Sequence, residues 1–295
     1  MAESDSALRA LILKTVTERA AEHGGTLTRT DLAHLQLPNG LEVRVIDQSR
    51  GIRNPRNMDA TLSVVSNPQG PYRDRHVSGG LFHYSYRAGS DDGDNLKLRR
   101  AFQLQLPIIL LQQLEPGLFV THAPVYVVDD LRERREFLLA LDESVRFLPR
   151  DLPENAPQRR YAERQVRHRL HQAEFRGRVI RAYRTRCAIC ALGHGQLLDA
   201  AHIIEDIADE GQPIVSNGLS LCKIHHAAFD ANLLGISPDY VVRINAEVLA
   251  EQDGPMLRHG LQEMNGHTLL LPATRQQWPD PDRLDRRFAA FVAAS

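Results

Sequence analysis

The sequence predicts an α+β protein, and three observations lead to this fold class. The chain has 295 residues, enough for one large hydrophobic core or, more typically, two ordinary ones. Helical periodicity marks the N-terminus and the segment 159–186, whereas residues 41–150 contain short β-branched and aromatic runs. The content of 42% hydrophobic and 25% charged residues is that of a soluble globular protein.

No stretch of the sequence approaches the roughly 20 consecutive apolar residues of a membrane-spanning helix. The N-terminus is acidic and lacks the pattern of a signal peptide. We therefore expect a cytoplasmic protein that does not contact a membrane. Its 36 basic residues nearly balance its 37 acidic residues, so composition alone does not indicate a nucleic-acid-binding protein.

Residues 6–37 are predicted to form a helical hairpin that caps the next domain. Gly24–Gly25 ends its first helix, and Thr30, or else Thr28, is expected to cap a second helix with the sequence DLAHLQL. A DNA-reading helix-turn-helix is the alternative. The hydrophobic face of the first helix consists of Leu8, Leu11, Ile12, Val16 and Ala20.

From residue 41 to 150 the sequence predicts a mixed β-barrel or curved sheet with one or two helices. The strand-like runs are LEVRVID, ATLSVVSN, GLFHYSYR, PIILLQQL and GLFVTHAPVYVV, and the helix NLKLRRAFQLQ interrupts them. Turn-forming clusters such as NPQGP, GSDDGD and EPG separate these runs.

Residues 151–160, DLPENAPQRR, are predicted to be an interdomain linker because they are polar and carry two prolines. Ten arginines but only two glutamates follow between residues 159 and 186, in a chain of net charge −1. A basic helix is often only a solvated face, but arginine forks also suit phosphate oxygens. The residues expected to contact a DNA backbone are Arg176, Arg178, Arg181, Arg184 and Arg186.

The three cysteines of the chain and one histidine have the spacing of a metal site. Cys187 and Cys190 form one CxxC pair, and Cys222 and His225 form a CxxH pair 31 residues later. Two such pairs suit tetrahedral zinc, and an odd number of cysteines argues against a disulfide framework. The alternative is three buried thiols and an unrelated histidine. We expect a structural Zn²⁺.

A second group of polar residues is not explained by this zinc ion. The run LDAAHIIE is predicted to be a strand, with Asp199 on one side and His202 on the other. His226 and Asp230 are four residues apart on a predicted helix and share a face about a quarter turn from His225. An imidazole and carboxylates near another histidine are suitable for a divalent metal and a general base.

The segment 187–235, with the motifs CAIC, LDAAHII and SNGLSLCKIHHAAFDANLLG, resembles an HNH nuclease domain with the ββα-metal fold. In that fold a β-hairpin carries the catalytic histidine, and the following helix carries metal ligands. In many members a zinc ion held by two cysteine-containing pairs supports the fold. The resemblance implies a metal-dependent endonuclease that hydrolyses phosphodiester bonds.

The resemblance also implies roles for individual residues. His202 would be the general base that activates water, and Asn217 would hold the following loop and orient His202. His226 would be a ligand of the catalytic metal, with Asp230 as a second ligand. The metal would be Mg²⁺ or Mn²⁺, or a second Zn²⁺ or Ni²⁺, because a histidine-containing set does not decide between them.

Two features depart from the pattern of the family. Many members have a metal-binding His or Asp immediately before the base, where this chain has Ala201. Asp199 lies on the same strand face and could reach the metal, or it could be a structural or outer-shell carboxylate. The second departure is a CxxH pair where CxxC is common, and His225 is a good zinc ligand.

The whole chain also resembles bacterial HNH restriction endonucleases with an N-terminal PUA- or SRA-like domain that reads bases. The segments PYRDRHVSGGLFHYSYR, DDGDN and PVYVVDD carry this resemblance. A base-flipping domain needs aromatic and hydrogen-bonding side chains around the extruded base. The candidates are Tyr72, Asp74, Phe82, Tyr84, Tyr86 and Asp91. The alternative is that the aromatic residues of GLFHYSYR are ordinary core residues of a strand.

The sequence therefore predicts three parts. Residues 1–150 form a DNA-reading domain, with a helical cap over 1–40 and a β-rich part over 41–150. Residues 151–186 form the linker and arginine-rich helix, and residues 187–295 form the HNH nuclease domain with a C-terminal appendage. In that appendage, HTLLLP is expected to be a strand, followed by a final helix.

We expect a restriction enzyme that cleaves double-stranded DNA, with modified cytosine (methylated or hydroxymethylated) as a candidate target and a homodimer as a candidate assembly. A zinc-stabilised nucleic-acid-binding regulator that keeps the HNH fold without cleavage is one alternative. A nicking or RNA-directed nuclease is another.

Overall fold

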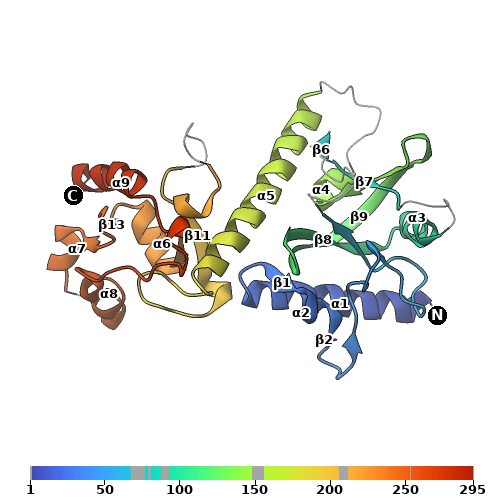
Figure 1. Ribbon diagram of the computed structural model, residues 1–295, viewed down its shortest axis with the longest axis horizontal. Helices are drawn as coiled ribbons and strands as arrows, with labels where there is room; N and C mark the ends of the chain where they lie inside the picture. Colours follow the sequence, from blue (N-terminus) through green and yellow to red (C-terminus); the bar gives the residue numbers. More distant parts are fainter. Residues whose placement is uncertain are drawn as a thin grey trace. The chain divides into compact units, whose positions relative to one another are not determined.

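The computed structural model divides the chain into two compact units, Met1–Ala21 with Gly25–His171 (unit 1) and Glu22–Gly24 with Gln172–Ser295 (unit 2). The unit boundary falls inside α5 (Pro157–Ala182), so one continuous helix contributes to both units (Figure 1). The described residues are 2–67, 77–78, 81–87, 93–147, 156–205, 212–252 and 254–294.

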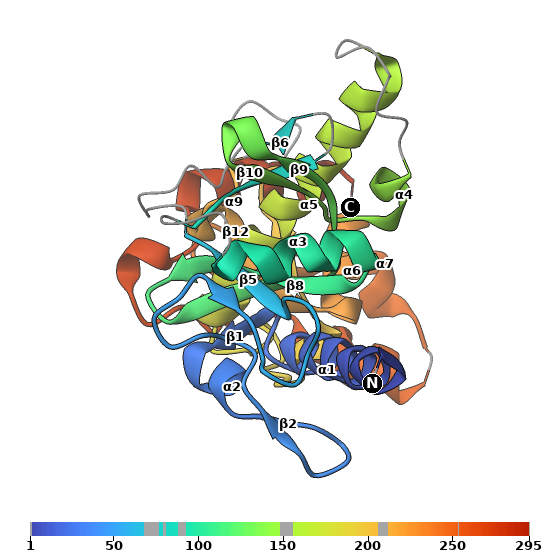
Figure 2. The same ribbon diagram turned by 90° about the vertical axis from the view of Figure 1, so that its right-hand side faces the viewer.

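Unit 1 is built on a sheet that curls into a half-barrel (Figure 2), which confirms the α+β class and the expected curved sheet. Among the strand pairs of the described residues, β5–β8 is the parallel one. The strand order is β4 (Ile52–Arg53), β5 (Ser63–Ser66), β8 (Pro107–Glu115), β9 (Leu118–Leu131), β10 (Glu136–Ala140), β7 (Leu81–Ser85) and β6 (Val77–Ser78), and β1 (Thr26–Thr28) pairs with β9.

Strand β8 is buried on both faces, which explains its uninterrupted hydrophobic run. Ile108 and Leu110 lie in one core cluster, whereas Ile109 and Leu111 lie in another. The first cluster includes residues of α3 (Asp94–Leu104) and the second includes residues of α1 (Ala2–Glu22). Because strand side chains alternate in direction, helices on both sides of β8 exclude water from every position of the run.

The N-terminal helices form the expected cap, with one difference in how the second begins. Thr28, not Thr30, is the N-cap of α2 (Arg29–Ala33), and it forms a capping box with Asp31. The Thr28 hydroxyl accepts a hydrogen bond from the Asp31 backbone, while the Asp31 carboxylate accepts one from the Thr28 backbone. This reciprocal pair satisfies two backbone donors, which a cap at Thr30 would leave without a partner.

The remainder of the expected second helix is extended. Residues Leu35–Gln36 form β2, which pairs with β3 (Glu42–Val43). Strand β10 was not expected either: its hairpin with β9 turns through RERR, where Arg135 has φ +54°, without the glycine or asparagine that usually marks such a turn.

The aromatic residues proposed for a base-reading pocket lie in the core of unit 1. Phe82, Tyr84 and Tyr86 are 3%, 4% and 3% exposed. The Tyr86 hydroxyl donates to Asp130 and accepts from Arg99, so its polar end is also used internally. The strand-core interpretation thus describes these three side chains, because alternation directs all of them to the same buried face. The other candidates, Tyr72, Asp74 and Asp91, lie outside the described residues.

Unit 2 begins in α5 and contains a β-hairpin followed by a helix (Figure 1). Strands β11 (Leu198–His202) and β12 (Gly218–Cys222) pair antiparallel, and α6 (Lys223–Asp230) follows β12 directly. The remaining elements are a second hairpin, β13 (Leu234–Ile236) with β14 (Val242–Ile244), and the helices α7 (Ala246–Ala250), α8 (Pro255–Gly260) and α9 (Pro281–Ala293).

The C-terminal appendage agrees only partly with expectation. Asp280 caps α9 by accepting hydrogen bonds from the Asp282 and Arg283 backbones. The HTLLLP segment, however, makes a single bridge, between Val241 and Thr268, rather than a strand. In the described part of the chain, no helix is long and apolar enough to cross a membrane.

Candidate functional site

Three thiols and one imidazole come together in unit 2. The Sγ atoms of Cys187, Cys190 and Cys222 and a ring nitrogen of His225 all lie within 4.8 Å of one another. The Nδ1 atom of His225 is 3.4 Å from the Cys187 Sγ and 3.2 Å from the Cys222 Sγ. The two sequence pairs therefore form one cluster, as their spacing predicts.

The backbone brings the first pair to the second through a tight turn. The Cys187 N–H donates to the Leu192 carbonyl, and the Ala191 N–H donates to the Cys187 carbonyl, with Ala191 at φ +59°. The Ala188 N–H donates to Ser220 of β12 at 2.7 Å. These bonds join the turn to the strand that ends in Cys222 and bring the thiols of the first pair close to Cys222.

The residues fit a tetrahedral metal ion, and His225 is already oriented for one. Its Nε2 is 2.7 Å from the Gly260 carbonyl, to which it donates, and this contact directs Nδ1 at the sulfur atoms. Hydrogen bonds from Cys187 and Cys190 lower the pKa of the Cys222 thiol. Burial lowers the pKa of His225, but its hydrogen bonds to Cys187 and Cys222 outweigh this effect and raise it to about 10. Such a cluster favours a bound cation, and three thiolates with one imidazole are typical zinc ligands.

A second polar cluster surrounds His226, on the neighbouring face of α6. Its Nε2 is 3.4 Å from the Asp230 carboxylate, and its Nδ1 is 3.6 Å from the Asp199 carboxylate. Asp230 is 64% exposed, whereas His226 and Asp199 are each 26% exposed. One short helix therefore contributes to both clusters, with His225 in the first and His226 in the second.

Asp199 already has two cationic neighbours. Lys223 Nζ donates to its carboxylate at 2.5 Å, and Arg176 Nε lies 3.7 Å away. Burial raises the pKa of Asp199, but the hydrogen bond and charge of Lys223, together with Arg176, outweigh burial and hold the pKa below its ordinary value. The carboxylate is thus ionised, and its charge is largely compensated by side chains.

His202 lies at the end of β11, with its ring stacked on Phe175 of α5. The ring centroids are 3.9 Å apart at an interplanar angle of 16°. The register pairs His202 with Gly218, where a Cβ atom would come within 2.8 Å of Phe175 and 2.5 Å of Val179. Because Gly218 has no side chain, α5 can approach the hairpin closely enough for the Phe175 ring to support His202.

Asn217 is fully buried and holds the chain immediately after His202. Its Oδ1 accepts from the Ile204 N–H at 2.9 Å, and its Nδ2 donates to the Ile204 and Gln212 carbonyls. Its own carbonyl accepts from the Ile203 N–H. These four bonds join the two ends of the loop between β11 and β12.

Ala201 is completely buried in the hydrophobic core of unit 2. The position where many HNH nucleases have a metal ligand therefore points into the protein interior in this chain. A carboxylate there would lose its hydration, so Ala201 fits its surroundings as a packing residue.

The predicted backbone-binding arginines separate into two kinds. Arg176 is half-buried and donates to the Gly195 and Leu198 carbonyls, so it holds the start of β11. Burial lowers its pKa, and Asp199 partly offsets this effect. The arginines with exposed side chains are Arg178, Arg181, Arg184 and Arg186.

Three residues that the sequence did not single out contribute to these clusters. Lys223 binds Asp199, Phe175 supports His202, and the Gly260 carbonyl orients His225. Only Phe175 carried a sequence signal, as an aromatic residue within an arginine-rich helix. The other two contacts depend on how distant segments fold together.

Residues 187–237 match the family model of the HNH endonucleases. The matched segment contains the metal-binding cluster and His202, Asn217, His226 and Asp230, so the predicted HNH resemblance is confirmed for this part of the chain. Among solved structures, a "Modification dependent TagI restriction endonuclease" is similar at 16% identity with a TM-score of 0.29, over 82% of this chain and 85% of that chain. No curated protein matches the chain.

The cluster of Cys187, Cys190, Cys222 and His225 is expected to hold about one zinc ion per chain, because its donor set is typical of structural zinc sites. His225→Gln and Cys187→Ser should each remove the zinc and lower the free energy of unfolding by roughly 4 kcal/mol or more. Elemental analysis and thermal unfolding measure the two effects.

His259→Gln, which removes an exposed histidine paired with Glu263, is the matched control and should keep the zinc. Wild-type protein that purifies with no zinc, and that a chelator does not destabilise, would contradict the assignment without relying on any variant.

Proposed function

We propose that this HNH endonuclease domain hydrolyses phosphodiester bonds of double-stranded DNA and requires a divalent metal, with His202 as the general base. The observation that carries the proposal is the pair formed by His226 and Asp230. Their ligand atoms are 3.4 Å apart on a helix that directly follows the hairpin of His202. This pair lies within the segment that matches the HNH endonucleases.

His202 would remove a proton from the attacking water. The water oxygen forms a bond to phosphorus, the proton passes to the imidazole, the bond from phosphorus to the leaving oxygen breaks, and that oxygen takes a proton from solvent. Because Nε2 of His202 is shielded from solvent, we assign proton acceptance to Nδ1. Stacking on Phe175 limits rotation of the ring and keeps this nitrogen in one direction.

Asn217 would act as a positioning residue rather than by touching substrate. Its side chain is fully buried, and its hydrogen bonds end on the backbone just after His202. Loss of these bonds would free the end of β11 and with it the direction of the imidazole. This role agrees with the asparagine expected from the HNH resemblance.

His226 and Asp230 would hold the catalytic metal, and their nitrogen and oxygen donors suit Mg²⁺ or Mn²⁺ as well as other divalent ions. Such an ion supplies Lewis-acid stabilisation of the charge that develops on the phosphate and on the leaving oxygen. Asp199 would be an outer-shell carboxylate that contacts the Nδ1 side of His226. Its existing contacts with Lys223 and Arg176 support this role over direct ligation, because both cations would repel a metal ion at that position.

DNA would be bound by the exposed arginines near the end of α5 and in the segment that leads to the zinc cluster. Arg178, Arg181, Arg184 and Arg186 are suited to phosphate oxygens because the guanidinium fork matches their geometry. Arg176 would instead support β11, since it already donates to two carbonyls of unit 2.

Unit 1 would provide the recognition function, with modified cytosine as its target and restriction of foreign DNA as the biological role. The support is the resemblance of segments in residues 71–130 to PUA- and SRA-like domains, together with the curved sheet of unit 1. Since Phe82, Tyr84 and Tyr86 lie in the core, a flipped base would be bound by side chains elsewhere in unit 1.

A zinc-stabilised DNA-binding regulator is the second candidate, and the buried Ala201 is the observation that favours it. Without a ligand at that position, metal binding would rely on fewer protein groups. The regulator would bind DNA but would not cut it under any metal condition.

His202→Ala should lower the cleavage rate by at least about a hundredfold, because a positioned general base contributes this much or more. Zinc content and DNA affinity should persist, since His202 belongs to neither the zinc cluster nor the arginine-rich surface. Cleavage of a supercoiled plasmid, elemental analysis and a gel-shift assay measure the three properties. His194→Ala, which removes an exposed histidine from the same domain, is the control and should cut normally. A His202→Ala protein that cuts at the wild-type rate would show that the proton acceptor is another group.

Asp230→Asn should raise the Mn²⁺ concentration needed for half-maximal cleavage at least about tenfold, because it removes a charged metal ligand. It should not change the melting temperature without added divalent metal, since Asp230 is largely exposed. Asp199→Asn should instead lower that melting temperature, because it breaks the contacts with Lys223 and Arg176. If Asp199→Asn abolishes the response to metal and leaves the melting temperature unchanged, Asp199 is a direct ligand.

Cleavage should be restricted to modified DNA when the protein is incubated with unmodified, methylated and hydroxymethylated duplexes of one sequence. The reason is that an N-terminal domain selective for a modified base would deliver only such DNA to the nuclease. The assay should include Mg²⁺, Mn²⁺, Ni²⁺ and added Zn²⁺. Equal cleavage of all three substrates would remove the modification dependence but keep the nuclease, whereas binding without cleavage in every metal would favour the regulator.

A further inference from the structure

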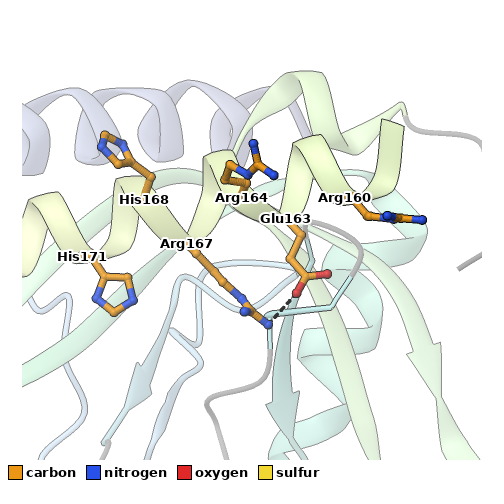
Figure 3. Close-up of a pocket in the computed structure, with 6 residues that line it drawn as sticks. All are labelled: Arg160, Glu163, Arg164, Arg167, His168 and His171. Carbon is orange, nitrogen blue, oxygen red and sulfur yellow. Dashed lines mark ion pairs between the residues drawn. The ribbon is translucent and has the colours of Figure 1, made fainter. Parts of the chain in front are cut away.

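The first half of α5 carries a basic hollow that belongs to unit 1. The hollow has a volume of about 470 Å³. Within the described residues, all six that line it come from α5 (Figure 3): Arg160, Glu163, Arg164, Arg167, His168 and His171. It is separate from the arginines proposed above for backbone binding, which begin at Arg178.

The spacing of these residues makes them one continuous face of the helix. They recur at intervals of three and four, so their side chains lie along a single stripe. Figure 3 shows Arg164 and His168 on one edge of the stripe and Glu163 and Arg167 on the other. A neighbouring stripe of Ala162, Val166 and Leu170 packs into the core of unit 1 and fixes the rotation of the helix. The basic stripe is therefore held in one orientation on the unit.

Among the described residues that line the hollow, basic side chains outnumber acidic ones. Glu163 is its only carboxylate among the described lining residues, and it pairs with Arg167 at 2.5 Å. Arg160 and Arg164 add two further guanidinium groups on the exposed surface. The described lining residues thus carry three guanidinium groups and one carboxylate.

The shape of the stripe favours a linear polyanion over a compact anion. From Arg160 to His171 the helix rises about 16 Å, at 1.5 Å per residue. One strand of a DNA duplex has a phosphate about every 3.4 Å along its axis, so about five phosphates span this length. A single phosphate group would contact only one or two of the three arginines.

We propose that this hollow binds the phosphodiester backbone of double-stranded DNA and forms a contact of unit 1 that is distinct from the nuclease site. The proposal rests on the proposed function for the choice of DNA. Arginine forks supply the bonds to phosphate oxygens, and the two histidines add hydrogen-bond donors along the same line. Such contacts position the duplex and carry no sequence information of their own, so the hollow would add affinity at every DNA sequence.

The test uses the full chain with His202→Ala, so that DNA is bound without being cut. Arg160→Gln, Arg164→Gln and Arg167→Gln are combined, because glutamine keeps the helix propensity while it removes the charges. The control combines Arg19→Gln, Arg100→Gln and Arg134→Gln, which removes three exposed arginines from α1, α3 and the β9–β10 turn. Fluorescence anisotropy with a 30-base-pair duplex measures Kd over a range of salt concentrations, and circular dichroism measures the melting temperature.

The combined variant of the three arginines (the hollow variant) should bind DNA at least about tenfold more weakly. The slope of log Kd against log salt concentration should fall by about two to three, because each lost phosphate contact lowers it by about 0.9. The control should keep the wild-type slope. Arg164→Gln alone should lower the slope by about one. This single variant is used if the combined variant does not fold. The proposal would be overturned if the hollow variant and the control lost the same amount of DNA affinity, or if neither lost any.

Two further outcomes separate this inference from the proposed function. If the chain binds DNA, wild-type protein cuts it, and the hollow variant binds as tightly as its parent, only the hollow assignment fails. If the chain neither binds nor cuts DNA, the proposed function itself fails. The last measurement uses an RNA duplex of the same sequence. If the chain binds RNA more tightly than DNA, and the hollow variant loses this RNA affinity, the hollow binds RNA and the DNA proposal is overturned.

Discussion

The convergence of three thiols and one imidazole where β12 meets α6 is the constraint on which the candidate site depends. Cys222 is the last residue of the strand, and His225 lies in the first turn of the helix. Their contact, completed by the CxxC turn, fixes the angle at which α6 leaves the hairpin. Because His226 and Asp230 lie on the next face of that short helix, the same angle sets their direction. A metal ion in the cluster would make this geometry rigid.

Helix α5 imposes the second constraint, because it supplies both packing and charge. In unit 2, Phe175 and Val179 pack where a side chain at Gly218 would otherwise lie, and Phe175 supports the ring of His202. In unit 1, a hydrophobic stripe of the same helix enters the core beside the basic hollow. One face of an amphipathic helix packs in a core while the opposite face stays exposed. The same helix can therefore stabilise a core and present arginines to a polyanion.

Local signals in the sequence predicted the site more completely than the surrounding fold. The spacing of Cys187, Cys190, Cys222 and His225 predicted their cluster, and the i, i+4 spacing predicted the contact between His226 and Asp230. Both follow from short-range geometry that any helix or turn must obey. Strand β10 was missed, and HTLLLP was predicted to be a strand but makes a single bridge. Pairing partners decide whether such runs become strands, and the partners are distant in the chain.

The sequence by itself determined the curved sheet of unit 1, the HNH segment, the metal-binding pairs and the concentration of arginine in one helix. Each of these features follows from residue type and spacing. Only the tertiary structure decided the surroundings of individual groups. It put Lys223 and Arg176 beside Asp199, enclosed Ala201 in the core, and buried the aromatic residues of β7. The physical reason is that burial and charge compensation depend on contacts between segments far apart in sequence, and no local pattern records which segments will meet.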